Sequence, residues 1–133
     1  MKDQKYNIIL FVVISILGLY SCEKTTNDPP TDVRDQYVGS WSCSESPLIN
    51  YPVVIRLDSN NSTQILISNF HLLGSNAKAY AIATINNLTL PSQVISGNTF
   101  NGSGTLVNAN KFTLKYYVNN LTDIDTVNAT YTK

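Results

Sequence analysis

Apolar and polar side chains alternate with a period of two in a series of short segments that runs from residue 37 to the end of the chain. In residues 37–45, Gly39, Trp41 and Cys43 fall on one face, and serines occupy the other. Successive side chains of an extended strand point to opposite faces, so this pattern is typical of antiparallel strands with one buried face. It predicts strands over residues 37–45, 51–58, 63–70, 77–85, 88–95, 99–107 and 111–118, and a last strand with Val127, Ala129 and Tyr131 inward.

Short turn sequences separate these segments. Asp, Asn, Ser and Gly cluster at residues 58–62, 96–98 and 108–110, where they favour tight turns. Strands that recur about every 8–12 residues with such turns between them indicate an all-β domain. We expect about eight strands in an antiparallel up-and-down meander that closes into a barrel. A β-sandwich is the alternative, and the alanines of residues 77–85 also permit a helix there.

Two details of the strand sequences favour closure. Pro91 lies inside a predicted strand and indicates an edge or a bulge, since proline cannot donate a ladder hydrogen bond. Gly102 and Gly104 share the inward face with Phe100 and Leu106, and successive glycines on one face allow the strong curvature of a barrel corner. Closure also removes the exposed strand edges that promote aggregation.

The N-terminal segment has the pattern of an export signal. A charged start is followed by an apolar run of twelve residues, Ile8 to Leu19. A membrane-spanning helix needs about 20 apolar residues, so the run indicates a signal peptide over residues 1–21.

Leu19-Tyr20-Ser21-Cys22 resembles the lipobox of bacterial lipoproteins, with an aliphatic residue three positions before the cysteine and a small residue directly before it. The resemblance implies cleavage after Ser21 and lipidation of Cys22. The lipid would anchor the protein in the cell envelope, in the outer membrane, facing the periplasm or the cell surface. An uncleaved signal anchor, and a cleaved signal that leaves Cys22 free, are the alternatives.

The segment that follows is predicted to be a tether. Residues 23–36 contain Pro29-Pro30 and almost no apolar side chain. Such a segment cannot bury enough surface to fold, so residues 22–36 are expected to be a lipidated cysteine with a disordered leash. The folded domain is then expected over residues 37–133.

The charge balance excludes one class of partner. The chain carries nine Lys and Arg side chains and nine Asp and Glu side chains, and without residues 1–21 it carries seven and eight. No basic surplus remains to neutralise phosphates, which argues against nucleic-acid binding. The expected partners are the membrane, a small ligand, and an envelope or secreted protein.

The first strand segment contains Tyr37-Val-Gly-Ser-Trp41, and later segments read Leu90-Pro-Ser-Gln93, Ser96-Gly97 and Gly102-Ser-Gly-Thr-Leu106. A meander of about eight strands that begins with Gly-x-Trp resembles the calycin superfamily, which includes lipocalins and avidins. The later segments are similar to small bacterial lipoproteins with calycin-like domains. The resemblance covers residues 37–133 and implies a lipocalin-like β-barrel more than it implies a deep ligand pocket.

Few residues are candidates for catalysis. Cys43 is the only thiol besides Cys22, and its place on the inward face predicts a buried, inert side chain. His71 is the only histidine and has no Asp or Glu near it in the sequence, whereas zinc needs about three or four protein ligands. Asp123 and Asp125 are expected in a solvated turn, because calcium needs about six to eight oxygens. We therefore expect no catalytic residue, metal or cofactor, and no enzyme.

Aromatic side chains provide the candidates for ligand binding, because their rings can stack on sugars or cover an apolar ligand. The set expected at the barrel mouth is Trp41, Tyr51, Tyr80 and Tyr116. If the large inward side chains enclose a cavity of about several hundred Å³, a small apolar or glycan ligand is favoured. If they fill the interior at core density, the surface loops and a protein partner are favoured.

The turn after residue 95 is the candidate partner loop. Its residues are Gly97, Asn98 and Phe100. Small lipid-anchored β-barrels resemble bacterial inhibitors of lysozyme or proteases, which insert a loop into an enzyme cleft. Three functions stay open: a non-catalytic binding or interaction domain, an inhibitor, and a structural subunit of a surface assembly. Asp125-Thr126-Val127 also resembles an acceptor for bacterial O-glycosylation at Thr126.

Overall fold

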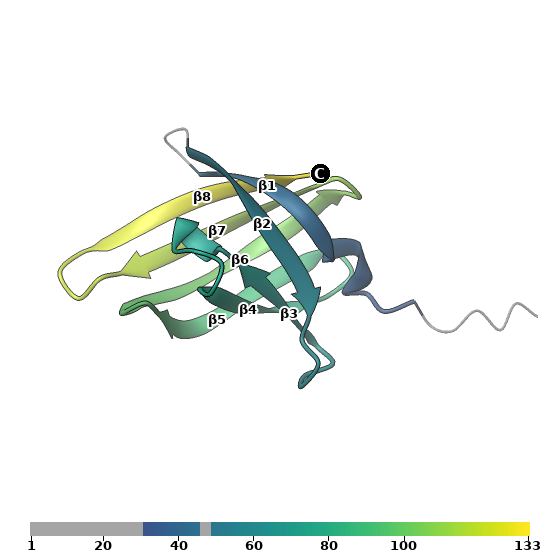
Figure 1. Cartoon of the computed structure of the whole chain (residues 1–133), viewed down its shortest axis with the longest axis horizontal. Helices are drawn as coiled ribbons and strands as arrows, with labels where there is room; N and C mark the ends of the chain where they lie inside the picture. The colour runs from purple at the N-terminus through teal and green to yellow at the C-terminus, as the bar shows by residue number, and fades with distance from the viewer. Residues whose placement is uncertain (1–30, 46–48) are drawn as a thin grey trace, which may run out of the picture. The chain divides into compact units, whose positions relative to one another are not determined.

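The computed structural model describes residues 31–45 and 49–133, which form a closed β-barrel (Figure 1). Its elements are η1 (Asp35–Tyr37), β1 (Gly39–Glu45), β2 (Ile49–Leu57), β3 (Gln64–Ser68), η2 (Phe70–Leu72), β4 (Lys78–Ala83), β5 (Asn87–Ile95), β6 (Asn98–Asn108), β7 (Lys111–Asn119) and β8 (Ile124–Thr132). Each strand pairs antiparallel with the next along the chain, and β8 returns to pair with β1. The predicted eight-stranded up-and-down barrel is therefore confirmed.

The alternatives at the level of fold are wrong. The sheet closes on itself, so it is no sandwich, and the alanine-rich segment forms β4 rather than a helix because its alternate side chains Ala79, Ala81 and Ala83 are buried. The ends of the first seven predicted strands differ from the observed ends by one or two residues at most. Among the described residues, no helix has the length and apolar character needed to cross a bilayer.

The barrel has two ends that differ in what covers them. The distal end carries the connections at residues 69–77, 96–97 and 120–123. The proximal end carries residues 31–37, where the chain enters the barrel, and the connections at residues 58–63, 84–86 and 109–110. In Figure 1 the proximal end lies to the right and the β7–β8 turn of the distal end lies to the left.

Large side chains fill the interior in two aromatic groups. At the proximal end the ring of Phe112 stacks on Tyr131, with centroids 4.3 Å apart, and receives the edge of Trp41 at 4.8 Å. At the distal end Phe70 meets Phe100 edge to face at 5.4 Å. All five rings are buried, as the alternation predicts for those on strands. An eight-stranded barrel is narrow enough for side chains to fill it, and these do.

Close approach of two strands explains the glycines of β6. Gly102 pairs with Tyr116 and Gly104 with Leu114 across the β6–β7 ladder. A Cβ at Gly102 would collide with the backbone of Lys115 and lie 2.6 Å from the Cβ of Tyr116. Only glycine leaves β7 the room to pack here. The register shift between Leu90 and Gln93 likewise confirms the irregularity predicted at Pro91.

The ordered domain begins earlier than the sequence indicates. Residues 31–36 were expected in a disordered tether, but Arg34 is only 7% exposed and η1 follows it directly. The Arg34 guanidinium donates hydrogen bonds to the carbonyl oxygens of Asp58, Asn61 and Gln64, at 2.9–3.3 Å. These bonds compensate for the missing apolar contacts, which is why a polar segment is held on the barrel. The predictions for the signal peptide (residues 1–21), Cys22 and the rest of the tether concern residues outside those described.

Candidate functional site

A charged cluster lies inside the distal end of the barrel. Glu45 is 8% exposed, and its Oε1 accepts hydrogen bonds from the hydroxyls of Tyr51 and, at 2.5 Å, Tyr116. The Nδ1 of His71 lies 3.2 Å from Glu45 Oε2 and 2.8 Å from the Tyr116 hydroxyl. We call these four residues the Glu45 cluster. It joins the consecutive strands β1 and β2 to η2 and β7, which lie further along the chain.

The alternation of β1 brings Glu45 inside. Glu45 follows Trp41 and Cys43 at intervals of two, so its side chain points to the interior although it is charged. Cys43 pairs with Tyr51 across β1 and β2, which places the tyrosine hydroxyl within reach of the carboxylate. A buried carboxylate is costly unless it is hydrogen-bonded, and the two hydroxyls and the imidazole meet that need.

A segment with unusual backbone angles holds His71 over the carboxylate. Asn69, His71 and Leu72 have φ values of 59°, 53° and 55°, in the left-handed region that residues other than glycine rarely adopt. The side chain of Asn69 donates to the carbonyl of Pro52 at 2.8 Å and accepts from the amide of Gly74 at 2.9 Å. Such angles cost about 1–3 kcal/mol each, so the surrounding contacts must enforce this conformation.

The protonation states in the cluster follow from its hydrogen bonds. Burial raises the pKa of Glu45, but the hydrogen bonds from His71, Tyr116 and Tyr51 outweigh it, and the net pKa is lowered. Burial raises the pKa of Tyr51 and of Tyr116, so both hydroxyls stay protonated and donate. Because the Tyr116 hydroxyl donates its hydrogen bond to Glu45, its oxygen is the acceptor toward His71, and the Nδ1 atom of the imidazole is the donor in that contact.

The lowered pKa of Glu45 makes its carboxylate a hydrogen-bond acceptor in this cluster rather than a general acid. A general acid at neutral pH needs a carboxyl with a raised pKa, whereas the pKa of Glu45 is lowered. The nearby thiol of Cys43 is fully buried, as expected from its phase, and burial raises its pKa to about 11. A thiol with that pKa is a poor nucleophile near neutral pH.

The sequence did not indicate the pairing of His71 with a carboxylate. His71 has no acidic neighbour in the sequence, but the fold places Glu45 beside it, with the imidazole Nδ1 3.2 Å from Glu45 Oε2. The phase of β1 was the available signal, because it puts Glu45 on the same face as Trp41 and Cys43. Which residue would face Glu45 depended on the path of residues 69–77, and alternation does not predict that path.

The four predicted ligand-binding residues do not form one site. Trp41 lies at the proximal end, where its indole donates to the carbonyl of Tyr37 at 2.7 Å and the ammonium of Lys133 lies 4.5 Å from its ring centre. Tyr51 and Tyr116 lie inside the distal end in the Glu45 cluster. Tyr80 lies half-buried on the outer face of β4, where its backbone bonds the side chain of Gln93.

The predicted partner loop is shorter than expected. Ser96 and Gly97 form a tight turn with positive φ between β5 and β6, and Asn98 already belongs to β6. Phe100 is fully buried against Phe70, so including it in an exposed loop was wrong. Its inward phase in β6 is the physical reason.

The described hollows lie on the outer face of the barrel rather than inside it. A groove of about 280 Å³ crosses β2, β3 and β4, and a second depression of about 350 Å³ lies over β6, β7 and β8. Inside, Trp41, Phe112 and Leu114 are at most 3% exposed and packed against their neighbours. The distribution of side chains therefore favours the outer surface over the interior as the place where a partner binds.

Removal of a tyrosine hydroxyl that has a hydrogen-bond partner should cost more stability than removal of one that has none. The buried hydroxyl of Tyr131 has no hydrogen-bond partner among the described residues, whereas that of Tyr116 donates to a carboxylate. We expect Tyr116→Phe to lower the free energy of unfolding by about 1.5–3 kcal/mol, and Tyr131→Phe to change it by less than about 1 kcal/mol or to raise it. Urea denaturation measures both. Equal losses in the two variants would contradict this assignment.

Replacement of Glu45 should change how the free energy of unfolding depends on pH in the acid range. The folded-state pKa of Glu45 is lowered from the ordinary 4.5, so its contribution is present above that value and is lost as the pH falls through the folded pKa. We expect Glu45→Gln to be less stable than the parent by about 1.5–3 kcal/mol at neutral pH, with the difference narrowing in acid. Urea denaturation across the acid range measures the difference. Asp125→Asn, at an exposed position, is the control, and its free energy of unfolding should vary with pH as that of the parent does. If the difference in stability between Glu45→Gln and the parent stayed constant across the acid range, the lowered pKa of Glu45 would be contradicted.

Comparison with known proteins supports the fold and nothing finer. No family model matches the sequence, and no curated protein matches it. A solved structure described as a redesigned β-barrel is similar, with a TM-score of 0.52 at 10% sequence identity. The likeness covers 77% of this chain and 95% of that chain. At this identity the likeness shows that the chain folds as a β-barrel, which agrees with the closed sheet of eight strands.

Proposed function

We propose that this protein is a lipid-anchored binding protein of the bacterial envelope, without catalytic activity, that contacts a protein partner through the distal end of its barrel. The observation that carries the proposal is a group of exposed apolar side chains at that end, on a barrel whose interior is filled. Contiguous apolar patches larger than about a few hundred Å² are rare on the surface of monomers, and they often mark interaction sites.

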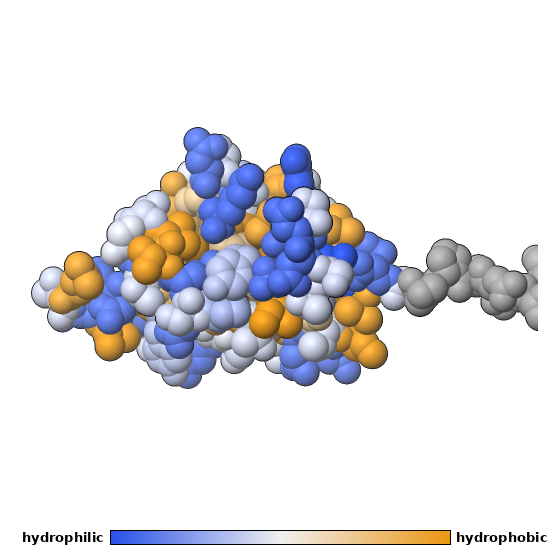
Figure 2. Space-filling view, turned by 90° about the horizontal axis from the view of Figure 1, so that it is seen from below, coloured by the Kyte–Doolittle hydropathy of each residue, from blue (hydrophilic) through white to orange (hydrophobic). Residues whose placement is uncertain are grey.

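The exposed apolar side chains lie on β5, β7 and β8 and in the turn between β7 and β8, and the polar Thr99 and Asn119 separate Val94 from Ile124. Val94, Thr99, Asn119 and Ile124 form one cross-strand row from β5 to β8. Val94 is 71% exposed, Ile124 is 67% exposed, and Leu121 in the adjoining turn is 88% exposed. Tyr117 lies on the same outer face of β7, two residues from the row. We call Val94, Tyr117, Leu121 and Ile124 the apolar rim. Figure 2 shows apolar surface at the left end of the molecule, where the β7–β8 turn lies in Figure 1.

The composition of the rim fits a protein partner. It combines aliphatic side chains with one tyrosine, and aromatic residues often supply most of the binding energy at protein interfaces. Leu72 in η2 is also half-exposed at this end and extends the apolar surface toward the Glu45 cluster. The cluster in turn fixes the segment that carries Leu72, so the partner would meet a preformed surface.

The direction of the chain supports an anchored role. The chain enters the barrel at residues 31–37, at the end opposite the rim. A lipid on Cys22, which the sequence pattern around Ser21 favours, would therefore tether the proximal end and leave the rim free. The Gly39-x-Trp41 motif at the proximal end, together with the meander, also supports the proposed likeness to calycin-like lipoproteins.

The inhibitor hypothesis depended on an exposed loop after residue 95 that could enter an enzyme cleft. The segment from Ser96 to Phe100 is a tight turn followed by a strand, and its aromatic residue is buried. Little of it remains to enter an enzyme cleft. The assembly hypothesis differs from the proposal only in the partner, which would be a structural component of the envelope rather than a transient one.

Substitutions in the rim should abolish binding of a partner without loss of stability. We expect that a variant with Val94→Ser, Leu121→Ser and Ile124→Ser fails to cross-link to the envelope protein that the parent captures. A variant with Ile85→Ser and Val107→Ser, two side chains of the proximal half that are 65% and 56% exposed, is the matched control and should capture it as the parent does. Cross-linking in cells followed by mass spectrometry measures this. Equal capture by both variants, or no specific capture by the parent, would overturn the proposed distal interface.

Anchoring has its own test. We expect the parent chain to incorporate a clickable fatty acid and to sediment with membranes, and the Cys22→Ser variant to do neither. Cys43→Ala is the control, because its buried side chain is no acylation site, and it should be labelled like the parent. An unlabelled parent that still sediments with membranes would indicate an uncleaved signal anchor, and an unlabelled soluble parent would indicate a cleaved signal with a free Cys22.

A further inference from the structure

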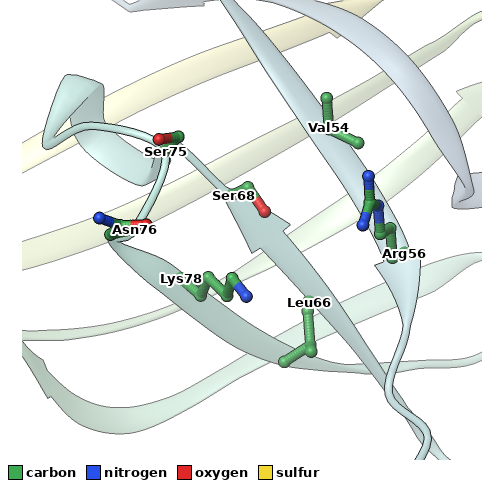
Figure 3. A pocket seen from close by; sticks show the side chains of 7 residues that line it. All are labelled: Val54, Arg56, Leu66, Ser68, Ser75, Asn76 and Lys78. Atoms are coloured by element: carbon green, nitrogen blue, oxygen red, sulfur yellow. The ribbon is translucent and has the colours of Figure 1, made fainter.

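The groove on the outer face of β2, β3 and β4 lies on other strands than the apolar rim and has a different chemistry. Its volume is about 280 Å³, and it is lined by Val54, Arg56, Leu66, Ser68, Ser75, Asn76 and Lys78 (Figure 3). Two cross-strand rows line it: Val54, Ser68 and Lys78 in one, and Arg56 with Leu66 in the other. Ser75 and Asn76 come from the end of the connection that carries His71.

Two positive charges flank this groove. Arg56 stands on β2 and Lys78 on β4, on opposite sides of β3, and Figure 3 shows the ammonium of Lys78 directed across β3. Neighbouring strands lie about 4.8 Å apart, so β2 and β4 are separated by about 10 Å, and two side chains of this length can both reach one group above β3. No Asp or Glu lines the groove.

These charges have no partner of the opposite sign in the described part of the chain. The ion pairs found there join Arg34 to Asp32 and His71 to Glu45, and neither Arg56 nor Lys78 takes part. Two like charges that share a groove repel each other, and an anion between them would remove that cost.

Neutral side chains line the rest of the groove. Ser68 lies on β3 between the strands that carry Arg56 and Lys78, and Ser75 and Asn76 line the groove at the β3–β4 connection. Hydroxyl and amide groups can donate hydrogen bonds. Val54 and Leu66 supply the apolar surface of the groove, which we call the apolar floor. Tyr80, the cross-strand partner of Leu66, extends the second row with an aromatic ring on the outer face.

We propose that this groove binds a ligand through an anionic oxygen group, a carboxylate, sulfate or phosphate, held between Arg56 and Lys78. Guanidinium and ammonium groups form strong, charge-assisted hydrogen bonds to such oxyanions, and hydroxyl and amide donors complete their coordination. The apolar floor suits a ring or chain attached to the anionic group. This is a second site, separate from the proposed distal interface, and it does not depend on it.

The test titrates the purified full chain in detergent with defined probes. The probes are sodium phosphate, sodium sulfate, a galacturonic acid dimer and the neutral galactose dimer, at constant ionic strength. Backbone amide chemical shifts report binding by residue. We expect saturable shifts centred on residues 54–56, 66–68 and 75–78 with at least one anionic probe, and none with the neutral dimer. Equal affinity for the inorganic ions and the acidic sugar identifies a free anion as sufficient, and tighter binding of the acidic sugar identifies a saccharide acid.

Charge-removing variants decide whether the groove is responsible. We expect Arg56→Gln and Lys78→Gln each to weaken binding by about tenfold or more, because each removes a charge-assisted hydrogen bond. Lys111→Gln removes an exposed charge from β7, outside the groove, and should bind within about twofold of the parent. Dispersed amide spectra for all variants show that they fold. Absence of binding by every anionic probe, shifts centred elsewhere, or equal affinity in all three variants would overturn the proposal.

Discussion

Closure of the sheet between β8 and β1 is the constraint on which the rest of this structure depends. Cys43 faces Tyr131 in that ladder, and the pairing removes the last free strand edge. Once a sheet of eight strands closes, the space inside it is fixed and must be filled by the inward side chains. Aromatic rings fill it at both ends, and the glycines of β6 let β7 approach where a larger side chain would collide.

Most of this fold could be predicted from the sequence because alternation is a local signal. The phase of each strand follows from its own residues, so Trp41, Phe112 and Tyr131 were assigned to the interior before their neighbours were known. Closure into a barrel rather than a sandwich was a preference based on spacing, and the structure decides it. The early start of the domain was missed because Arg34 is held by carbonyls of the β2–β3 connection, which a search for apolar residues does not detect.

The Glu45 cluster could not be predicted from the sequence pattern of single strands. The inward phase of Glu45 was readable, and a charge on a buried face requires partners. Those partners come from β2, β7 and η2, and the position of His71 depends on three residues with left-handed backbone angles. Of Asn69, His71 and Leu72, only the asparagine is of a residue type that tolerates such angles, so the sequence does not predict them for the other two. The conformation follows from long-range contacts, so only the assembled barrel reveals it.

Because side chains fill the interior, we look for function on the surface. One segment links the Glu45 cluster to the two surfaces proposed to bind partners, the distal end and the groove. Residues 69–77 carry His71 inward to the Glu45 cluster, Leu72 toward the distal surface, and Ser75 and Asn76 to the groove. Asn69 fixes the start of this segment to β2 and to Gly74. The Glu45 carboxylate and the His71 imidazole hold the middle of this segment. Ser75 and Asn76, near its end, are therefore held in a defined position. The buried carboxylate therefore anchors a surface segment, which reduces the ordering that a ligand in the proposed groove site or a partner at the proposed distal interface would have to impose.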